Sequence, residues 1–189
     1  VGPYAVSDYY MESRKAQAHA MENAKQVILD VAKDFEKISG RKYGLIEEYK
    51  MDDAEYAMVI IGSAAGTAKE AVDEIREAGK KVGIIKIRSF RPFPGEEIAT
   101  SLKKCKAVAV MDRCESFSTN GGPVGAETMQ AMYTNGCTAK AINIMYGIGG
   151  RDVTVGDMRG VYDTLEEIAK TGETGPTYRY MGLRDKEAK

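Results

Sequence analysis

The sequence predicts a three-layer α/β/α fold built around a mostly parallel sheet of five strands. Near-continuous apolar runs alternate with segments of helical pattern, as a parallel sheet covered by helices on both faces requires. Strand, helix and strand follow one another at the spacing of right-handed parallel crossovers. With 189 residues and 43% hydrophobic content, the chain can bury one good core.

A long amphipathic helix is predicted first, from Ser13 to Ser39, because apolar residues recur every three or four positions among charged ones. Ser13 can accept the free amide hydrogens of the first turn, and Gly40 allows a left-handed exit. Arg41 and Lys42 place positive charge near the carboxyl end of the helix. The apolar positions are Met21, Ala24, Ile28, Val31, Phe35 and Ile38.

An edge strand comes next, over Tyr43 to Lys50, where the strand pattern is weak. Met51 to Glu55 contains two aspartates and predicts a turn, since Asp favours local backbone bonding.

The core of the sheet begins with the apolar run from Tyr56 to Ile61, followed by Gly62 and a helix over Thr67 to Ala78 that Gly79 ends. Lys81 to Ile87 is the next strand. The same alternation then continues to the end of the domain. It predicts helices over Gly95–Lys104, Val124–Tyr133 and Asp157–Lys170, with strands over Ala107–Met111 and Ala139–Met145.

Three regions follow from this pattern. Residues 1–42 form a connector and the long helix, residues 43–170 form the α/β domain, and residues 171–189, rich in Gly, Thr, Pro and charge, form an arm or tail. The chain begins at Val1 without a methionine, and its first dozen residues have the composition of a connector. We therefore expect a piece of a longer polypeptide.

Composition excludes several classes of partner. A formal net charge of -1 and a pI near 6.0 give no positive field for a phosphate backbone, so nucleic acid is not expected. No apolar run is long enough to span a membrane, and the start lacks a signal-peptide pattern. The three cysteines are too widely spaced for a CxxC pair or a cluster motif. We expect a cytoplasmic protein with reduced thiols.

The inventory of reactive side chains is small. The single histidine, His19, falls in the long helix away from its apolar stripe, which favours a solvated residue. With this one histidine, neither a Ser/His/Asp triad nor a His/Cys metal site can be assembled convincingly. We expect no catalytic residue, no bound cofactor and no metal site in this chain.

The turn from Ile61 to Thr67 (IGSAAGT) is the best candidate for a phosphate-binding loop, because it joins a strand to the exposed amides of a helix start. Its GxxxG spacing matches neither GxGxxG nor the Lys-bearing P-loop. Arg88, near the end of the next strand, could hold the extra phosphate of NADP. The favoured explanation is structural, because every parallel α/β domain has tight strand-to-helix turns that need glycine.

Three further loops should converge at the carboxyl edge of the sheet, spanning Arg88–Pro94 (RSFRPFP), Asp112–Gly125 and Tyr146–Asp152 (YGIGGRD). Arginines beside aromatic rings, prolines and close-approach glycines favour an interface. The helix after Gly-Gly-Pro should turn its positive end to this edge, where an anion or a partner backbone could approach. The alternative is that ion pairs pin these loops to their own domain. The interface candidates are Arg88, Phe90, Arg91, Phe93, Arg113, Gly121, Gly122, Gly149, Gly150, Arg151 and Asp152.

The order of these motifs resembles the alpha subunit of pyruvate (2-oxoacid):ferredoxin oxidoreductase, the pyruvate synthase class, from about Tyr4 to about Ala169. RSFRPFP and YGIGGRD occur at the family's spacing, with MDR and NGGP between them. By this resemblance the domain has the fold of the C-terminal domain of transketolase. Its edge strand, Tyr43 to Lys50, would then run antiparallel to the rest of the sheet.

The resemblance implies a complex that uses thiamine diphosphate, Mg and 4Fe-4S clusters to cleave a 2-oxoacid, with coenzyme A as co-substrate and ferredoxin as electron acceptor. It implies that other chains or domains hold these centres. This region would support the catalytic domain and pack against the beta, gamma and delta subunits. The alternatives are the corresponding domain of another thiamine-dependent enzyme and a free-standing NADP- or phosphate-binding module.

Overall fold

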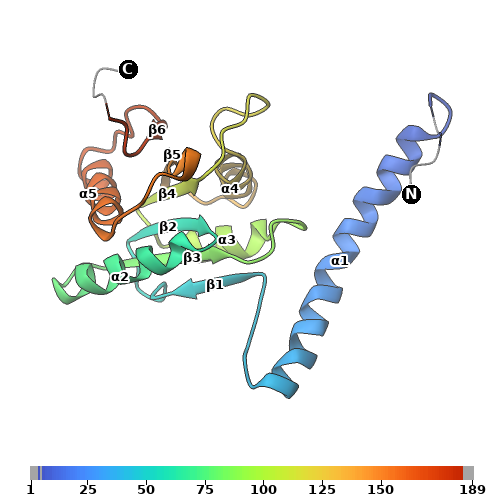
Figure 1. The fold of residues 1–189 in the computed structure, drawn as a ribbon, viewed down its shortest axis with the longest axis horizontal. Helices are drawn as coiled ribbons and strands as arrows, with labels where there is room; N and C mark the ends of the chain where they lie inside the picture. Colours follow the sequence, from blue (N-terminus) through green and yellow to red (C-terminus); the bar gives the residue numbers. More distant parts are fainter. Residues whose placement is uncertain (1–3, 5, 185–189) are drawn as a thin grey trace.

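A computed structural model describes residues 4 and 6–184 of the chain. Its centre is a six-stranded sheet in the order β1-β3-β2-β4-β5-β6, sandwiched between two layers of helices (Figure 1). The strands are β1 (Ile46–Tyr49), β2 (Tyr56–Ile61), β3 (Val82–Ile87), β4 (Ala107–Asp112), β5 (Lys140–Met145) and β6 (Tyr178–Tyr180). The helices are α1 (Tyr10–Ser39), α2 (Ala64–Glu77), α3 (Gly95–Leu102), α4 (Pro123–Thr134) and α5 (Val155–Thr171), with a short 3-10 turn at Ile148–Gly150.

The two faces of the sheet bury two separate cores, so the predicted three-layer fold is confirmed. Helices α2 and α5 cover one face and α3 and α4 cover the other. Strand β4 is buried along its whole length, and its alternate residues serve both cores: Met111 faces α2 and α5, whereas Val110 faces α3 and α4. Burial on both faces explains why the central strands are uniformly apolar in the sequence.

The edges of the sheet are formed by its two shortest strands. Strand β1 pairs antiparallel with β3, with Ile46 opposite Ile87, as expected for the edge strand. At the other edge, β6 pairs parallel with β5 and adds a sixth strand to the expected five. The segment after Thr171, expected as an arm or tail, therefore contributes to the sheet. Three residues are too few to give a periodic pattern in the sequence, and residues 185–189 lie outside the described part.

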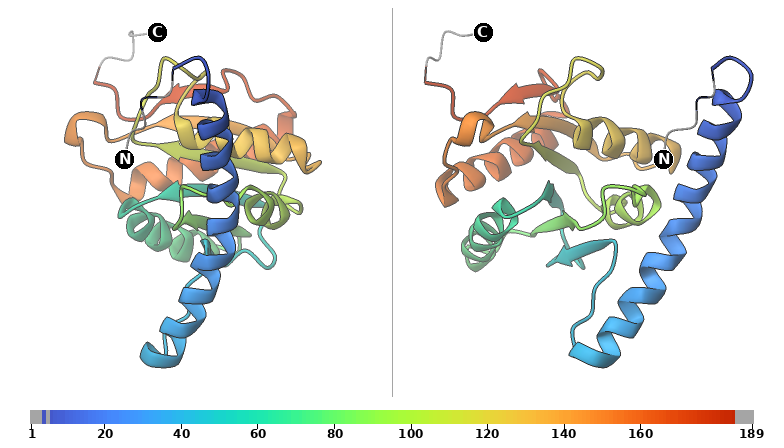
Figure 2. Two further views of the ribbon diagram at one scale, coloured as in Figure 1. Left: turned by 90° about the vertical axis from the view of Figure 1, so that its right-hand side faces the viewer. Right: turned by 45° about the vertical axis from the view of Figure 1, so that its right-hand side comes forward.

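Helix α1 is 30 residues long and none of them is buried. It starts at Tyr10, ahead of the expected Ser13, and no side chain caps it; Gly40, with φ of 69°, ends it as predicted. The helix leans away from the sheet beside α3 (Figures 1 and 2). One ion pair, Lys25 to Glu97 of α3 at 2.8 Å, and the ring contact of Phe35 with Tyr43 connect it to the domain.

Among residues 4 and 6–184, no helix has the length and apolar character needed to cross a membrane.

Candidate functional site at the carboxyl edge of the sheet

The loops singled out in the sequence follow the carboxyl ends of β3, β4 and β5, and the turn at Gly62 follows β2. Because β2, β3, β4 and β5 are parallel neighbours, all of these connections emerge at one edge of the sheet. The predicted convergence of the three loops is therefore present. The side chains in them nevertheless fall into two groups with different surroundings.

The Arg88–Pro94 loop is closed onto its own domain. The Arg88 guanidinium lies 2.5 Å from a Glu47 carboxylate oxygen of β1 and stacks 4.5 Å from the centre of the Tyr43 ring. Arg91 pairs at 2.5 Å with Glu127 of α4. Both arginines thus have carboxylate partners within the chain.

The two phenylalanines of this loop also face inward. Phe90 and Phe93 meet edge to face with their ring centres 5.9 Å apart, and both pack on the core beneath α3 and α4. The rings therefore hold the loop in place, which matches the alternative interpretation of RSFRPFP as a loop packed on its own domain.

A buried polar network holds the loop after β4. Asp112, 1% exposed, accepts hydrogen bonds from the amides of Val124 and Gly125 at 3.0 and 2.8 Å. The Asn143 side chain donates to Asp112 at 2.8 Å and accepts from the Gly122 amide at 2.8 Å. The positive end of α4 is thus occupied by the protein's own carboxylate. The expectation that an outside anion could approach there is wrong, because Asp112 already fills that position.

The glycines of the NGGPVG segment are explained by this network. A Cβ at Gly122 would lie 2.1 Å from Cγ of Asp112, and a Cβ at Gly121 or Gly125 would lie 2.4 Å from side-chain atoms of Asn143. Gly121 and Gly122, predicted as interface residues, are therefore required by close packing inside the domain. Sequence reasoning missed Asn143, whose only signal is one polar residue within an apolar strand.

The other group of side chains surrounds a cavity of about 280 Å³, here called the edge pocket. It lies between the start of α2 and the loop after β5, and Arg113 and Arg151 both line it. Among the described residues, neither arginine is paired with a carboxylate. The lining residues are Ser63, Ala64, Thr67, Arg113, Tyr146, Gly150, Arg151, Asp152 and Val153.

Backbone carbonyls position the two arginines. Arg113 donates to the carbonyl of Gly147 at 3.4 Å, and Arg151 donates to the carbonyl of Gly182, just beyond β6. A Cβ at Gly147 would lie 2.9 Å from Nε of Arg113, and the residue has φ of 61°, so glycine suits this position for two reasons. Gly149 also has a positive φ, whereas nothing in the domain crowds its Cβ position.

The candidate phosphate-binding turn differs from its prediction in two ways. Helix α2 begins at Ala64, three residues before the expected Thr67, which shortens the turn after Gly62. Arg88, the expected phosphate partner, is engaged by Glu47 and does not line the edge pocket. Arg113 and Arg151 lie beside this turn in its place.

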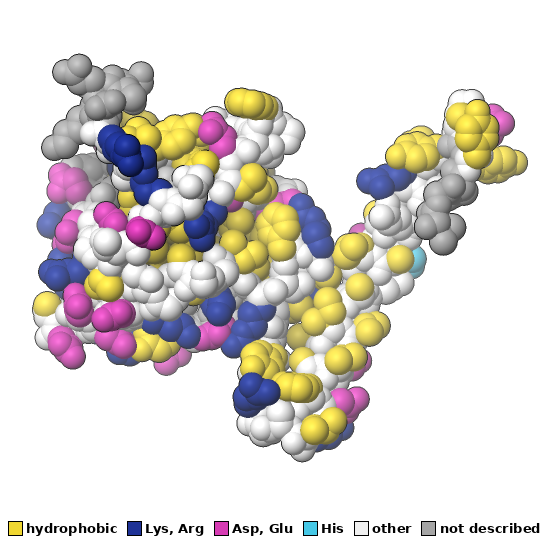
Figure 3. Space-filling model, in the orientation of Figure 1, with side chains coloured by type: hydrophobic (Ala, Val, Ile, Leu, Met, Phe, Trp, Pro, Cys, Tyr) yellow, Lys and Arg dark blue, Asp and Glu magenta, His cyan; other side chains and the backbone are white. Residues whose placement is uncertain are grey.

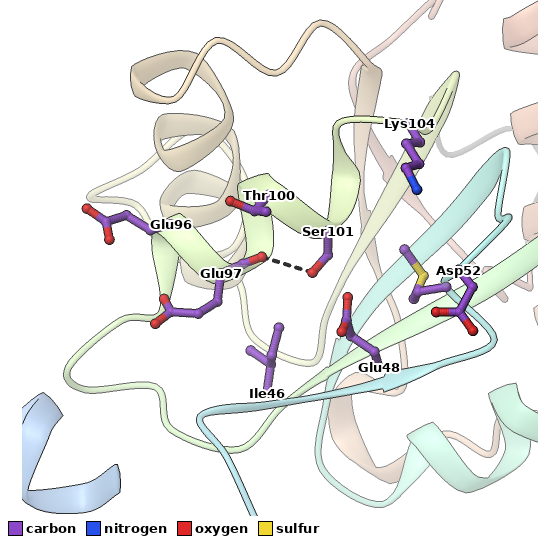
Figure 4. A pocket seen from close by; sticks show the side chains of 9 residues that line it. Ile46, Glu48, Asp52, Glu96, Glu97, Thr100, Ser101 and Lys104 are labelled. Atoms are coloured by element: carbon purple, nitrogen blue, oxygen red, sulfur yellow. Dashed lines mark hydrogen bonds between the residues drawn. The ribbon is translucent and has the colours of Figure 1, made fainter.

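A larger cavity of about 640 Å³ lies between β1 and α3 and contains none of the predicted interface residues (Figure 4). Four carboxylates and a single lysine line it, and Ser101 donates to the Glu97 carbonyl at its wall. Among residues 4 and 6–184, no group of three His, Cys, Asp or Glu side chains is arranged to hold a metal ion.

Comparison with known proteins identifies a family. Residues 54–158 match the family described as "Pyruvate:ferredoxin oxidoreductase core domain II". The chain is 40% identical over 184 residues to pyruvate synthase subunit PorA of Thermotoga maritima, covering 97% of this chain and 46% of that protein. It is 43% identical over 169 residues to the alpha subunit of NADH-dependent phenylglyoxylate dehydrogenase of Aromatoleum evansii, covering 89% of this chain and 40% of that subunit.

A solved structure shares the fold. The 2-oxoglutarate:ferredoxin oxidoreductase of Magnetococcus marinus superposes with a TM-score of 0.51 at 16% identity, over 87% of this chain and 24% of that chain. The present chain spans about half the length, or slightly less, of the curated relatives it matches.

Proposed function

The chain belongs to the pyruvate:ferredoxin oxidoreductase core domain II family, and we propose that it serves as one domain of the alpha subunit of such an enzyme. The proposed reaction of the whole enzyme is oxidative decarboxylation of pyruvate with coenzyme A to acetyl-CoA and CO2, with electrons passed to ferredoxin. The proposed role of this domain is to support the catalytic parts and to join subunits. Its proposed partners are the beta, gamma and delta subunits, and ferredoxin through the complex, in the cytoplasm.

The 4Fe-4S clusters of the proposed enzyme do not fit the cysteines of this chain. A 4Fe-4S cluster takes four thiolates, and the sequence contains three cysteines. One of them, Cys105, is buried, and burial raises the pKa of its thiol to about 12. We propose that thiamine diphosphate, Mg and the clusters are held elsewhere in the complex, and no catalytic step is assigned to this domain.

The observation that carries the assembly role is the exposed apolar face of α1. Val31 is 61% exposed and Ile38 is 86% exposed, although both belong to the predicted apolar stripe. Figure 3 shows hydrophobic side chains running along the helix. Each such side chain contributes about 1.5–3 kcal/mol when it is fully removed from water, so this face favours a covering partner.

The spacing of the stripe supports a helix as that partner. Its six positions alternate by three and four residues, which places them at the a and d sites of a heptad repeat. Alanines at positions 18, 20 and 32 flank the stripe and allow a second helix to approach closely. We propose that the occupant is a helix from the remaining part of the same oxidoreductase.

The activity is tested on the native complex, purified through this subunit under anaerobic conditions. Reduction of methyl viologen is measured with coenzyme A and a panel containing pyruvate, 2-oxoisovalerate, 2-oxoglutarate and phenylglyoxylate. We expect the highest kcat/KM with pyruvate. A different preferred 2-oxoacid would contradict the substrate assignment, and activity with none of the panel would contradict the function.

A further inference from the structure

We infer that the edge pocket binds a small tetrahedral oxyanion, of the class of phosphate or a single phosphoryl group, through Arg113, Arg151 and the first-turn amides of α2. This inference is independent of the proposed assembly role, because it concerns the carboxyl edge of the sheet rather than α1. It also differs from the dinucleotide alternative, which relied on Arg88.

The first support is the concentration of unneutralised positive charge. Of the four arginines in the edge loops, Arg88 and Arg91 are paired with carboxylates, whereas Arg113 and Arg151 contact only backbone carbonyls among the described residues. Both line the same cavity. Guanidinium groups offer several N–H donors in a planar fork that suits the oxygens of phosphate.

The second support is the start of α2, which opens into the same pocket. The Gly66 amide donates to the Ser63 carbonyl at 2.9 Å, whereas the Ala64 and Ala65 amides have no partner among the described residues. No side chain caps the helix, and its first turn contains no acidic residue. The other three helices that start beside these loops differ, and α3 has Glu96 and Glu97 in its first turn. Helix α4 receives the Asp112 carboxylate, and α5 has a capping box formed by Thr154 and Asp157. The Ala64 and Ala65 amides therefore remain available to an outside anion.

The third support is Tyr146, which lines the pocket with 2% of its surface exposed. Its hydroxyl makes no hydrogen bond to a described residue. Thr128 Oγ1 is the one fully enclosed side-chain polar atom without a partner in the described part, so the Tyr146 hydroxyl is not fully enclosed. Tyr146 also lines a neighbouring cavity beside Glu115. Burial raises the pKa of Tyr146, while the nearby positive charge of Arg113 acts to lower it. The hydroxyl is thus protonated at neutral pH and free to donate to an anion.

The size and the charge of the pocket limit the ligand. A volume of about 280 Å³ lies at the lower end of the range for small-molecule sites, which favours a single anionic group over a whole dinucleotide. Asp152 also lines the pocket and opposes an anion there. Removing the negative charge of Asp152 should therefore strengthen anion binding, whereas removing either arginine should weaken it.

The experiment is a calorimetric titration of the full chain with inorganic phosphate at low ionic strength, in a buffer without polyvalent anions. We expect one site per chain. Arg113→Gln and Arg151→Gln should each weaken binding about tenfold or more, because each removes a charge-assisted contact. Tyr146→Phe should weaken it a few-fold and Asp152→Asn should tighten it a few-fold.

The control is Arg159→Gln, which removes an exposed arginine of α5 that pairs with Glu74 away from the pocket. It should leave the affinity unchanged. Absence of binding by the wild-type chain, or equal weakening by Arg159→Gln, would overturn the inference. The titration is repeated on the assembled oxidoreductase, where phosphate should still bind. Exclusion of phosphate there would show that a neighbouring protein group fills the pocket, which would overturn the assignment to a small oxyanion.

Discussion

The α/β domain and helix α1 differ in whether their distinctive residues have partners within the same fold. In the domain, the close-approach glycines and two of the four edge-loop arginines are explained by partners within the same fold, such as Asn143 for Gly121 and Glu47 for Arg88. In α1, the large side chains of the apolar stripe remain exposed and no residue is buried. Distinctive loops can therefore be structural, whereas an ordinary amphipathic helix carries the exposed apolar surface for which we propose a partner.

The buried network of the domain should have the largest effect on the free energy of unfolding. Replacing Asp112 by Ala leaves two α4 amides and one N–H of the Asn143 side chain without an acceptor in a buried site. Loss of charge-assisted hydrogen bonds of this kind costs about 1.5–3 kcal/mol each, so we expect a total loss of about 3 kcal/mol or more. Urea denaturation measures it. A loss below about 1 kcal/mol would contradict the structural role assigned to the network.

The glycines of the network should give the next largest effect. Gly122→Ala forces a methyl group against Asp112, and overpacking of this kind costs about 1–3 kcal/mol. Gly160→Ala is the matched control, since its Cβ position in α5 meets nothing within 4 Å. The control should be neutral or stabilise by about 0.5–1 kcal/mol, through helix propensity. Equal effects of the two substitutions would show that close approach does not explain the Gly-Gly-Pro motif.

The sequence predicts the α/β domain better than it predicts the network inside it. Apolar runs reflect burial directly, so the strand predicted over Tyr56 to Ile61 has the same bounds as β2. The partner of Asp112 could not be found in the same way, because Asn143 comes from a strand 31 residues away and lies among apolar neighbours. Strand β6 is similar, since its pairing with β5 depends on tertiary contact.

The partners of the loop arginines are harder still to predict, because the sequence shows the arginines but not the side chains that face them. Arg88 and Arg91 find carboxylates in β1 and α4, whereas Arg113 and Arg151 turn to a common pocket. Nothing in the motifs RSFRPFP and YGIGGRD separates these two outcomes. The difference depends on Glu47 and Glu127, which lie far from either motif in the chain.

Arg88 provides a smaller test of the self-contained domain. Arg88→Gln should lower the free energy of unfolding by about 0.5–1 kcal/mol, as is typical of a partly exposed ion pair. A double-mutant cycle with Glu47→Gln measures the coupling. Zero coupling would show that the contact with Glu47 does not stabilise the loop.

The same ion pair should make stability depend on pH. Lys69 first, and then Arg88, hold the pKa of Glu47 below its ordinary value of 4.5. A carboxylate with a lowered folded-state pKa stabilises the fold above its unfolded pKa, and this stability is lost as the pH falls through the folded-state pKa. The stability gap between wild type and Glu47→Gln should therefore be present at pH 7 and shrink below pH 4.5. A gap that is constant with pH would contradict the pairing.

Helix α1 should give the smallest effect on stability. Val31→Asp alters an exposed position, so the free energy of unfolding should change by no more than about 0.5 kcal/mol. A larger loss, measured by the same urea denaturation, would mean that the stripe belongs to the domain's own core.

The measurement that tests the central claim most directly is assembly of the oxidoreductase with Val31→Asp in its alpha subunit, followed by size-exclusion chromatography with light scattering. Asn23→Asp, which adds the same charge at an exposed polar position of α1, is the control. The assembly role predicts that Asn23→Asp joins the complex like wild type, whereas Val31→Asp remains folded but elutes outside it. Full incorporation of Val31→Asp would contradict the claim that the apolar face of α1 joins this domain to the rest of the enzyme.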